Sequence, residues 1–271
     1  MVYKSFLPVV FIAFSVTMSS AGELIRPGER IPLLMGELFI PNDFSLETNG
    51  VNLVFHLHSS PKAAQTAFAK ARLNAVQIAL HLGSFSSPYQ NFFSNSERFD
   101  VILDSALDAL KMRYHSLALT WGHVCVTAFS GGYGGAREFM RFPHIYEQID
   151  SLILLDCPHA GYTAERKVVP RQIEGFVRFA KDAVAGNKTF IMTHSEIAPE
   201  NYASTTECAD FLIASISGKR KPWSGVNEMG MEQQTRYDAG QFHIYGYKGE
   251  TAIDHMKHLH GMYLFLNQIK M

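Results

Sequence analysis

Cysteine is scarce in this chain, and the few cysteines form no recognisable pattern. Only Cys125, Cys157 and Cys208 occur in 271 residues, and their spacing matches no common zinc site. Two of them stand in apolar runs that are typical of adjacent buried strands, so we interpret all three as small buried hydrophobes. The sequence therefore predicts neither a disulfide framework nor a metal held by cysteines.

An excess of charge of either sign is also missing. The chain has 24 Lys and Arg against 25 Asp and Glu, a formal net charge of −1. Nucleic-acid partners and anionic membrane surfaces select for clustered positive charge. We therefore predict that neither is a partner. The hydrophobic share of 47% with 18% charged residues is ordinary for a globular domain.

Long hydrophobic runs are missing except at the amino terminus. There Lys4 precedes an apolar run over residues 6–18, and Ser19-Ser20-Ala21 places small residues before a cut after Ala21. The run is shorter than the about 20 apolar residues of an ordinary membrane span. We predict a signal peptide over residues 1–21 and a single exported domain over residues 22–271, secreted or periplasmic, without a stable membrane span. An uncleaved membrane anchor is the alternative.

Strand and helix patterns alternate through the rest of the chain. Strand patterns are predicted over residues 36–41, 51–58, 75–82, 123–129, 149–155, 189–193 and 242–247. The run over 149–155 is continuously apolar, as in a strand buried on both faces of a parallel sheet, whereas 36–41 is expected at an edge. The alternation predicts an α/β fold: a doubly wound, mainly parallel sheet with helices on both faces, without a large lid domain.

Helix starts and loops are predicted from shorter signals. Capping boxes at Ser94–Glu97 and Ser204–Glu207 mark the starts of two helices, and Asp254 is expected to cap the last one. The aromatic stretch over residues 85–93 and the stretch over 219–240 show no regular period. Both are predicted to be irregular.

The stretch from His123 to Gly135 predicts a buried strand, a tight turn and a helix, with Ser130 at the apex of the turn. Small residues, Ala128 and Gly132, stand two positions on either side of this serine, as a close approach of strand and helix requires. Strained backbone at the apex would project the hydroxyl and point the Gly131 amide at whatever it attacks. A plain glycine-rich turn is the alternative, and the lysine of a phosphate-binding loop is missing.

This stretch resembles the nucleophile elbow of the α/β-hydrolase superfamily, with Ala128 where the first glycine usually stands. The resemblance implies that the order along the chain is serine, acid, histidine, with the histidine just beyond the last strand. His255, His258 and His260 stand there. His255 is favoured because it lies at the start of the last helix, and His258 is the alternative.

The resemblance does not decide which of two carboxylates is the acid. Asp156 ends the apolar run after the serine turn, and Glu196 follows the next strand. A buried carboxylate without a partner is costly, so Asp156 is expected to have one and ranks first. Glu196 is the alternative. The resemblance also places a second oxyanion amide in the loop after residues 51–58, at Ser59 or Ser60, where the superfamily often has glycine.

These parts predict a serine hydrolase that cleaves a carboxylic ester or a related acyl bond of a small molecule, without a cofactor. Pocket walls are expected from the aromatic stretch near Phe92, from residues 159–162 and from the region of Trp223. His56 with His58, or His255 with His258, could pair on a metal, but neither pair has a third ligand at a familiar spacing, so no metal is predicted. A catalytically inactive hydrolase fold that only binds a ligand is the alternative function.

Overall fold

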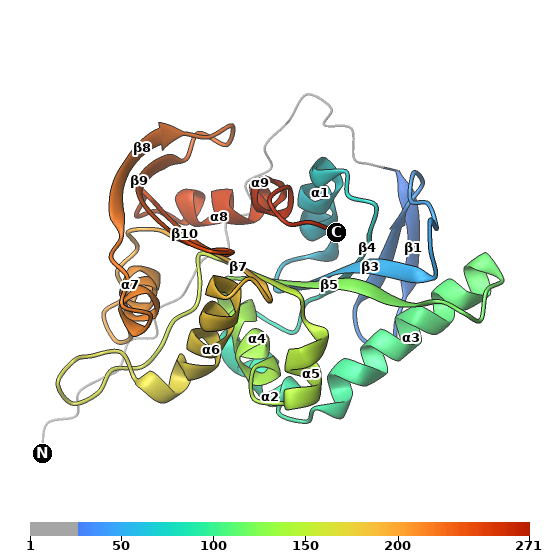
Figure 1. Ribbon diagram of the computed structural model, residues 1–271, viewed down its shortest axis with the longest axis horizontal. Coiled ribbons are helices and arrows are strands. Elements are labelled where there is room, and N and C mark those ends of the chain that lie inside the picture. Colours follow the sequence, from blue (N-terminus) through green and yellow to red (C-terminus); the bar gives the residue numbers. More distant parts are fainter. Residues whose placement is uncertain (1–26) are drawn as a thin grey trace, which may run out of the picture.

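One ten-stranded sheet runs through the part of the chain that the structure describes, residues 27–271 (Figure 1). The structure is a computed structural model, and the predicted signal peptide lies outside the described residues. The strands are β1 (Gly28–Pro32), β2 (Glu37–Pro41), β3 (Gly50–Leu57), β4 (Val76–Leu80), β5 (Thr120–Phe129), β6 (Ser151–Leu155), β7 (Thr189–His194), β8 (Lys221–Val226), β9 (Glu232–Ala239) and β10 (Phe242–Tyr247).

The spatial order of the strands is β1-β2-β4-β3-β5-β6-β7-β10-β9-β8. The six strands from β4 to β10 in this order are parallel to one another, and the pairings outside them, β1 with β2, β2 with β4, β10 with β9 and β9 with β8, are antiparallel. Parallel neighbours need crossover connections, which the intervening helices supply. The predicted mainly parallel sheet is therefore confirmed.

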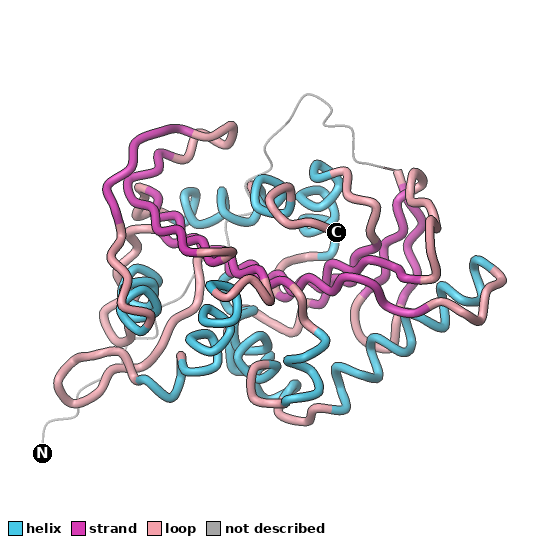
Figure 2. Tube along the Cα trace, viewed as in Figure 1, coloured by secondary structure: helices cyan, strands magenta, loops and turns pink. Residues whose placement is uncertain are grey.

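Helices cover both faces of this sheet (Figures 1 and 2). On one face lie α1 (Pro61–Ala71), α8 (Ala252–His260) and α9 (Met262–Leu266). The other face carries α2 (Ser86–Phe93), α3 (Glu97–Tyr114), α4 (Tyr133–Phe139), α5 (Pro143–Gln148), α6 (Glu174–Val184) and α7 (Thr205–Ser215). The predicted doubly wound arrangement is confirmed as well.

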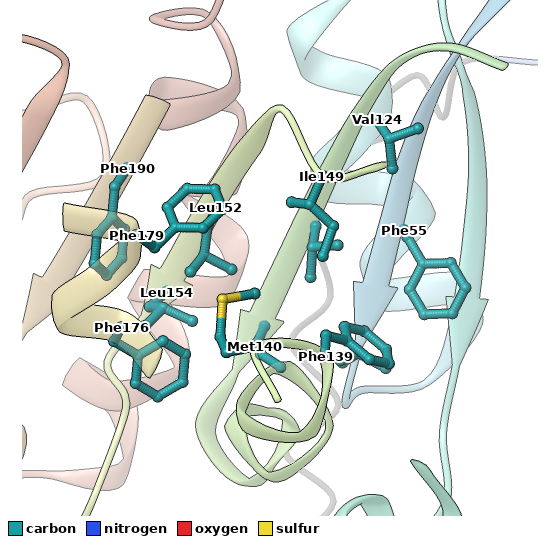
Figure 3. Packing of buried hydrophobic residues seen from close by; sticks show 14 of the residues in the cluster. Phe55, Val124, Phe139, Met140, Ile149, Leu152, Leu154, Phe176, Phe179 and Phe190 are labelled. Atoms are coloured by element: carbon teal, nitrogen blue, oxygen red, sulfur yellow. The ribbon is translucent and has the colours of Figure 1, made fainter. Parts of the chain in front are cut away.

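Side chains of the central strands alternate between the two cores. In β5, Val124 and Val126 pack under α2–α7, whereas Cys125 and Phe129 pack under α1, α8 and α9. This follows from the period of two in a strand. All five residues of β6 are buried, as its continuous apolar run predicts. Figure 3 shows part of the first core, in which Phe139 lies beside Phe55 of β3 and Met140 lies beside Phe176 of α6.

Three predicted details of local structure are wrong. Residues 219–240 contain the antiparallel pair β8 and β9, which is largely exposed and therefore lacks an apolar period in the sequence. Residues 86–93 form α2. Strand β2 is not an edge, because β1 pairs with its outer side.

The helix caps are partly as expected. The capping box at Ser204 and Glu207 is present, so this prediction is confirmed. At α3 the predicted box is not formed, and Asn95 Oδ1 accepts from the Glu97 amide instead. At α8 the cap is Thr251, and Asp254 is its partner three residues later rather than the cap. Both errors shift a helix start by a few residues, which is the least reliable part of such predictions.

Candidate active site

The predicted serine and acid lie at the ends of neighbouring parallel strands. In the pairing of β5 with β6, Phe129 stands opposite Leu155, and each is the last residue of its strand. Ser130 and Asp156 come directly after these two residues. The carboxyl ends of parallel strands share one edge of the sheet, so both side chains start from the edge where ligands bind in such folds.

The backbone is strained at this edge. Ser130 and Asp156 both have a φ of 46°, and His58 and Ser59 after β3 have φ values of 74° and 153°. In the described part of the chain, the other non-glycine residues with positive φ follow helices or lie in a turn: Arg72, His115, Arg166 and Ser217. Such conformations cost about 1–3 kcal/mol each and persist where function requires them. The strain thus gathers around the predicted site.

The turn after β5 is closely packed against two other backbone segments. Ser130–Gly132 form a 3₁₀ turn between β5 and α4, as the sequence predicts. A Cβ added to Gly132 would lie 2.3 Å from the Leu57 carbonyl oxygen, and one added to Gly134 would lie 2.2 Å from the Ser86 carbonyl oxygen. Only glycine allows these approaches. The small residues around Ser130 therefore have a structural cause.

His255 and Asp156 form a hydrogen-bonded pair. The His255 Nδ1 atom lies 2.7 Å from Asp156 Oδ2, although the two residues are 99 positions apart in the sequence. The imidazole ring also packs on Phe129, with 4.5 Å between ring centroids, immediately before Ser130. Helix α8 supplies the histidine from its first turns, as predicted. Of the two possible acids, the structure brings Asp156 to this histidine.

Asp156 is buried among donors. Its side chain is 2% exposed, and Oδ1 accepts from the Ser195 amide at 2.9 Å and from Thr205 Oγ1 at 3.0 Å. The Ser195 hydroxyl donates to Oδ2 at 2.8 Å. Burial by itself raises the pKa of Asp156, but the hydrogen bonds from His255 and Ser195 and the electrostatic effect of the neighbouring His258 and His255 side chains outweigh burial. The pKa is therefore well below its usual range, and the carboxylate is ionised at neutral pH.

The sequence analysis missed Ser195 and Thr205. Both residues lie at the same edge of the sheet as Asp156, the first directly after β7 and the second at the start of α7. Ser195 could have been found as a polar residue that directly follows a buried strand. Thr205 has no such signal, because its hydrogen bond depends on how α7 packs.

Glu196, the alternative acid, connects two loops. Its Oε2 atom accepts from the Gly249 amide at 3.2 Å, and its own amide donates to the Gly249 carbonyl at 3.0 Å. These bonds join the loops after β7 and β10. The geometry therefore gives Glu196 a role in holding the loop that leads to α8.

His258, the alternative histidine, is buried behind the pair. Its Nδ1 atom lies 2.7 Å from Thr193 Oγ1, and that hydroxyl accepts from the Asp156 amide at 3.0 Å. Burial lowers the pKa of His258 to about 4. A neutral, buried imidazole held in this way supports the Asp156 backbone and is not placed to meet a substrate.

The loop after β3 presents two free amides. Within residues 27–271, neither the Ser59 nor the Ser60 amide donates a hydrogen bond to a protein group, and the Ser60 hydroxyl caps α1 by accepting from the Ala63 amide. The φ of 153° at Ser59 is one that glycine adopts most easily. Serine thus adopts there a conformation for which the superfamily often uses glycine.

No hydrogen bond joins Ser130 Oγ to His255 Nε2 in the described chain. Ser130 is half-buried, at the end of β5, and the His255 ring lies over the residue before it. Contacts between a nucleophile and its base are often long before substrate binds and shorten in the complex. A triad would require the Ser130 hydroxyl and His255 Nε2 to come within hydrogen-bond distance.

The histidines that could pair on a metal are engaged elsewhere. His56 Nδ1 lies 2.7 Å from Thr127 Oγ1, and its Nε2 lies 2.9 Å from the His58 carbonyl oxygen. His58 Nδ1 lies 3.2 Å from the Tyr89 hydroxyl. Over the described residues, no group of three or more His, Cys, Asp or Glu could hold a metal ion.

The expected pocket walls are only partly near the site. The backbone of Phe85 lies directly against Gly131, and its side chain is 73% exposed. Tyr202 packs edge-on against His159 in the loop after β6, with 4.9 Å between ring centroids. Trp223 lies instead on the β8–β9 pair, under the Arg236 guanidinium. Phe92 is in α2, where the Arg98 guanidinium covers its ring.

Buried neutral histidines predict acid sensitivity. Burial lowers the pKa of His56 and His258 to about 4 and that of His194 to about 3. The unfolded chain binds protons on these side chains below pH about 6.5, whereas the native chain does not, so stability falls as the pH falls from about 6.5 toward 4. Each histidine is expected to cost roughly 2 kcal/mol at pH 5.

Urea unfolding at pH 7 and pH 5 measures this effect. We expect a clearly lower midpoint at pH 5 with an unchanged dependence on urea concentration. An equal midpoint at both pH values would mean that these imidazoles are already protonated in the native protein.

Comparisons with known proteins found similarity to solved structures but no match in sequence. No protein-family model matches the chain, and no curated protein matches it significantly. Among solved structures, it is similar to a cold-adapted esterase from an Arctic intertidal metagenomic library (12% identity, 89% of this chain and 91% of that chain, TM-score 0.45).

Two further structures are similar over most of their length. They are an alpha-beta serine hydrolase homologue from Coxiella burnetii (13% identity, 92% and 99% covered, TM-score 0.43) and a siderophore hydrolase from Aspergillus nidulans (10% identity, 92% and 97% covered, TM-score 0.45). At these identities the likeness says nothing about substrate. The strand order shows a doubly wound, mainly parallel α/β fold, and the serine turn after β5 and the histidine beyond the last parallel strand lie where the resemblance to α/β hydrolases implies them.

Proposed function

We propose that this protein is a serine hydrolase that cleaves a carboxylic ester, or a related acyl bond of a small molecule, through an acyl-serine on Ser130. The observation that carries the proposal is the hydrogen-bonded pair of His255 and Asp156 beside the strained Ser130 turn. A serine hydroxyl is a weak nucleophile until an oriented base removes its proton. Here the base is held by a buried, ionised carboxylate.

In the proposed mechanism each group has its own step. Ser130 Oγ attacks the acyl carbon while His255 Nε2 takes its proton, and Asp156 stabilises the imidazolium that forms. The Gly131 amide, with the amide of Ser59 or Ser60, donates to the oxyanion. His255 then gives the proton to the leaving alcohol, and a water molecule activated by the same histidine releases the acid from Ser130.

No cofactor is needed for these steps, because nucleophile, base and oxyanion donors all come from the chain. The competing proposal is a catalytically inactive hydrolase fold that binds its ligand without cleaving it. That reading would leave Ser130 without an activated hydroxyl, so the two proposals differ in one chemical property.

A fluorophosphonate probe tests this property. We expect the probe to label the folded wild-type protein covalently on Ser130, because only an activated serine reacts. Peptide mass spectrometry identifies the labelled residue. Absence of labelling, together with no turnover in a broad panel of esters, thioesters and amides, would leave the binding protein as the better proposal.

The amino-terminal pattern supports export of this hydrolase. Residues 1–21 are proposed to be a signal peptide that is removed, so that the mature protein begins near Gly22. No helix within residues 27–271 is long and apolar enough to cross a membrane. Amino-terminal sequencing of the protein from its native host checks the cut, and an intact Met1 would rule it out.

A further inference from the structure

A cavity of about 700 Å³ lies away from the predicted catalytic residues, between α2, α4 and the start of α6. Ser130, Asp156 and His255 are not among its walls. Its volume is within the range of sites that bind small organic molecules, roughly 300–1,000 Å³. Met140 and Phe176 give the cavity an apolar portion, and Figure 3 shows these two side chains facing each other between the α4 region and α6.

Positive charge dominates the polar walls. Four arginines line the cavity, Arg137, Arg141, Arg171 and Arg178, against two glutamates, Glu138 and Glu174. The excess is two positive charges, four minus two. One pair is neutralised within the protein, because Glu138, 1% exposed, binds Arg141 at 2.5 Å.

The remaining arginines lack carboxylate partners among the described residues. Arg178 donates to the Met140 carbonyl at 2.6 Å and lies over the Tyr146 ring, 3.7 Å from its centroid. The exposed Arg171 makes no ion pair or hydrogen bond within residues 27–271. Arg178 is positioned by a backbone contact and an aromatic contact, and within residues 27–271 no ion pair neutralises the charge of Arg178 or Arg171.

Arg137 is the group that most needs a counter-charge. It is half-buried, donates to the His159 carbonyl at 2.5 Å and lies over the Tyr133 ring, but its Nε atom is buried without a hydrogen-bond partner. Burial lowers the pKa of Arg137, which shows that the protonated form is poorly solvated there. Nε itself is fully buried, so an anion in the cavity would compensate the charge of this guanidinium without bonding to Nε.

We propose that this cavity binds a small organic phosphate monoester. A phosphate monoester carries a charge near −2 at neutral pH and three acceptor oxygens, which matches the excess charge and the several unpaired guanidinium donors. Guanidinium groups bind phosphate through paired hydrogen bonds. An inorganic ion would fill only part of the cavity, whereas an organic portion would occupy the rest, beside the wall in which Met140 and Phe176 are almost fully buried.

Binding at this site would also affect the region of the catalytic acid. Arg137 holds the His159 carbonyl, and Gln172 in the cavity wall accepts from the Gly161 amide at 2.7 Å. Both partners belong to the loop that directly follows Asp156 and β6. A ligand on Arg137 is therefore in direct contact with a side chain that fixes this loop.

Isothermal titration with phenyl phosphate tests the proposal. We expect one saturable site per chain, with an affinity that falls as ionic strength rises. Arg171→Glu reverses an exposed, unpartnered charge without a structural cost, so it is expected to weaken binding at least about tenfold. Arg137→Gln removes the charge together with the donor to the His159 carbonyl, and it is expected to weaken binding as strongly; thermal unfolding shows whether the variant is folded.

Two controls separate this site from other causes. Lys219→Glu makes the same change of charge as Arg171→Glu on an exposed lysine outside the cavity, and it is expected to leave affinity unchanged. Ser130→Ala is expected to bind phenyl phosphate as the wild type does, which excludes binding at the catalytic serine.

Three outcomes would overturn the proposal. They are the absence of saturable binding up to about 10 mM, an equal loss of affinity in Arg171→Glu and Lys219→Glu, and tighter binding of succinate than of phenyl phosphate. The last would assign the cavity to dicarboxylates. Phenyl phosphate binding does not require hydrolysis at Ser130, so a failure here leaves the proposed hydrolase activity intact.

Discussion

Ser130→Ala is expected to lower the turnover of short p-nitrophenyl esters by a factor on the order of 10⁶, and His255→Ala by a similar factor. The nucleophile and its base act as one unit, since a serine without a base is as inactive as a base without a serine. The double variant is therefore expected to be little worse than either single variant. Steady-state release of p-nitrophenol measures the turnover of all three variants. Short esters are suitable substrates because they need few contacts with the pocket.

The control for this experiment must account for strain at Ser130. Ser217 has a φ of 58° and directly follows the α7 cap, far from the strand ends that carry the site. Ser217→Ala therefore makes the same substitution in a similar backbone conformation, and we expect it to keep wild-type turnover. Circular dichroism and thermal unfolding show whether each variant is folded.

Some results would contradict the proposed roles. If Ser130→Ala is folded and retains most of the activity, another residue carries the acyl group. If the double variant loses the product of the two single losses, serine and histidine act independently, and they do not form a nucleophile and base pair.

Much of the fold could be predicted from the sequence because the central strands of the sheet are buried. The apolar run at β6 and the small residues around Ser130 result from burial and close backbone contact, and both constraints act on the residues themselves. The β8–β9 pair could not be predicted in this way. Its residues are largely exposed, so burial imposes no period on them.

Only those site residues could be predicted that directly follow a strand or begin a helix. Ser130, Asp156 and His255 each follow a strand or begin a helix at one edge of the sheet, which a sequence pattern can indicate. The donors to Asp156 depend on which loops meet across 39 and 49 positions of the chain, and no local pattern records that. For the same reason, the sequence could not decide whether Asp156 or Glu196 is the acid.

Asp156→Asn is expected to lower turnover by up to about 10⁴ with the fold intact. The cause lies in the donors around the carboxylate. The Ser195 amide donates to Oδ1, and a backbone N–H cannot be turned away, so the new NH₂ group cannot occupy that position without leaving donors unpaired. The NH₂ group must therefore take the position of Oδ2, where it faces His255 Nδ1.

An NH₂ group at that position donates to Nδ1 and so stabilises the tautomer of His255 that carries its proton on Nε2. That tautomer cannot take a proton from Ser130, so the loss falls on the base and not on substrate binding. We expect kcat to fall with little change in KM for p-nitrophenyl esters, and labelling by a fluorophosphonate to slow in parallel. Glu196→Gln is the matched control, because it makes the same carboxylate-to-amide change on the other candidate acid. Within residues 27–271, Glu196 Oε2 accepts a hydrogen bond only from the Gly249 amide, at 3.2 Å. We expect Glu196→Gln to lower turnover by a few-fold at most. A larger loss in Glu196→Gln than in Asp156→Asn would transfer the role of the acid to Glu196. Small losses in both variants would mean that neither carboxylate orients the base.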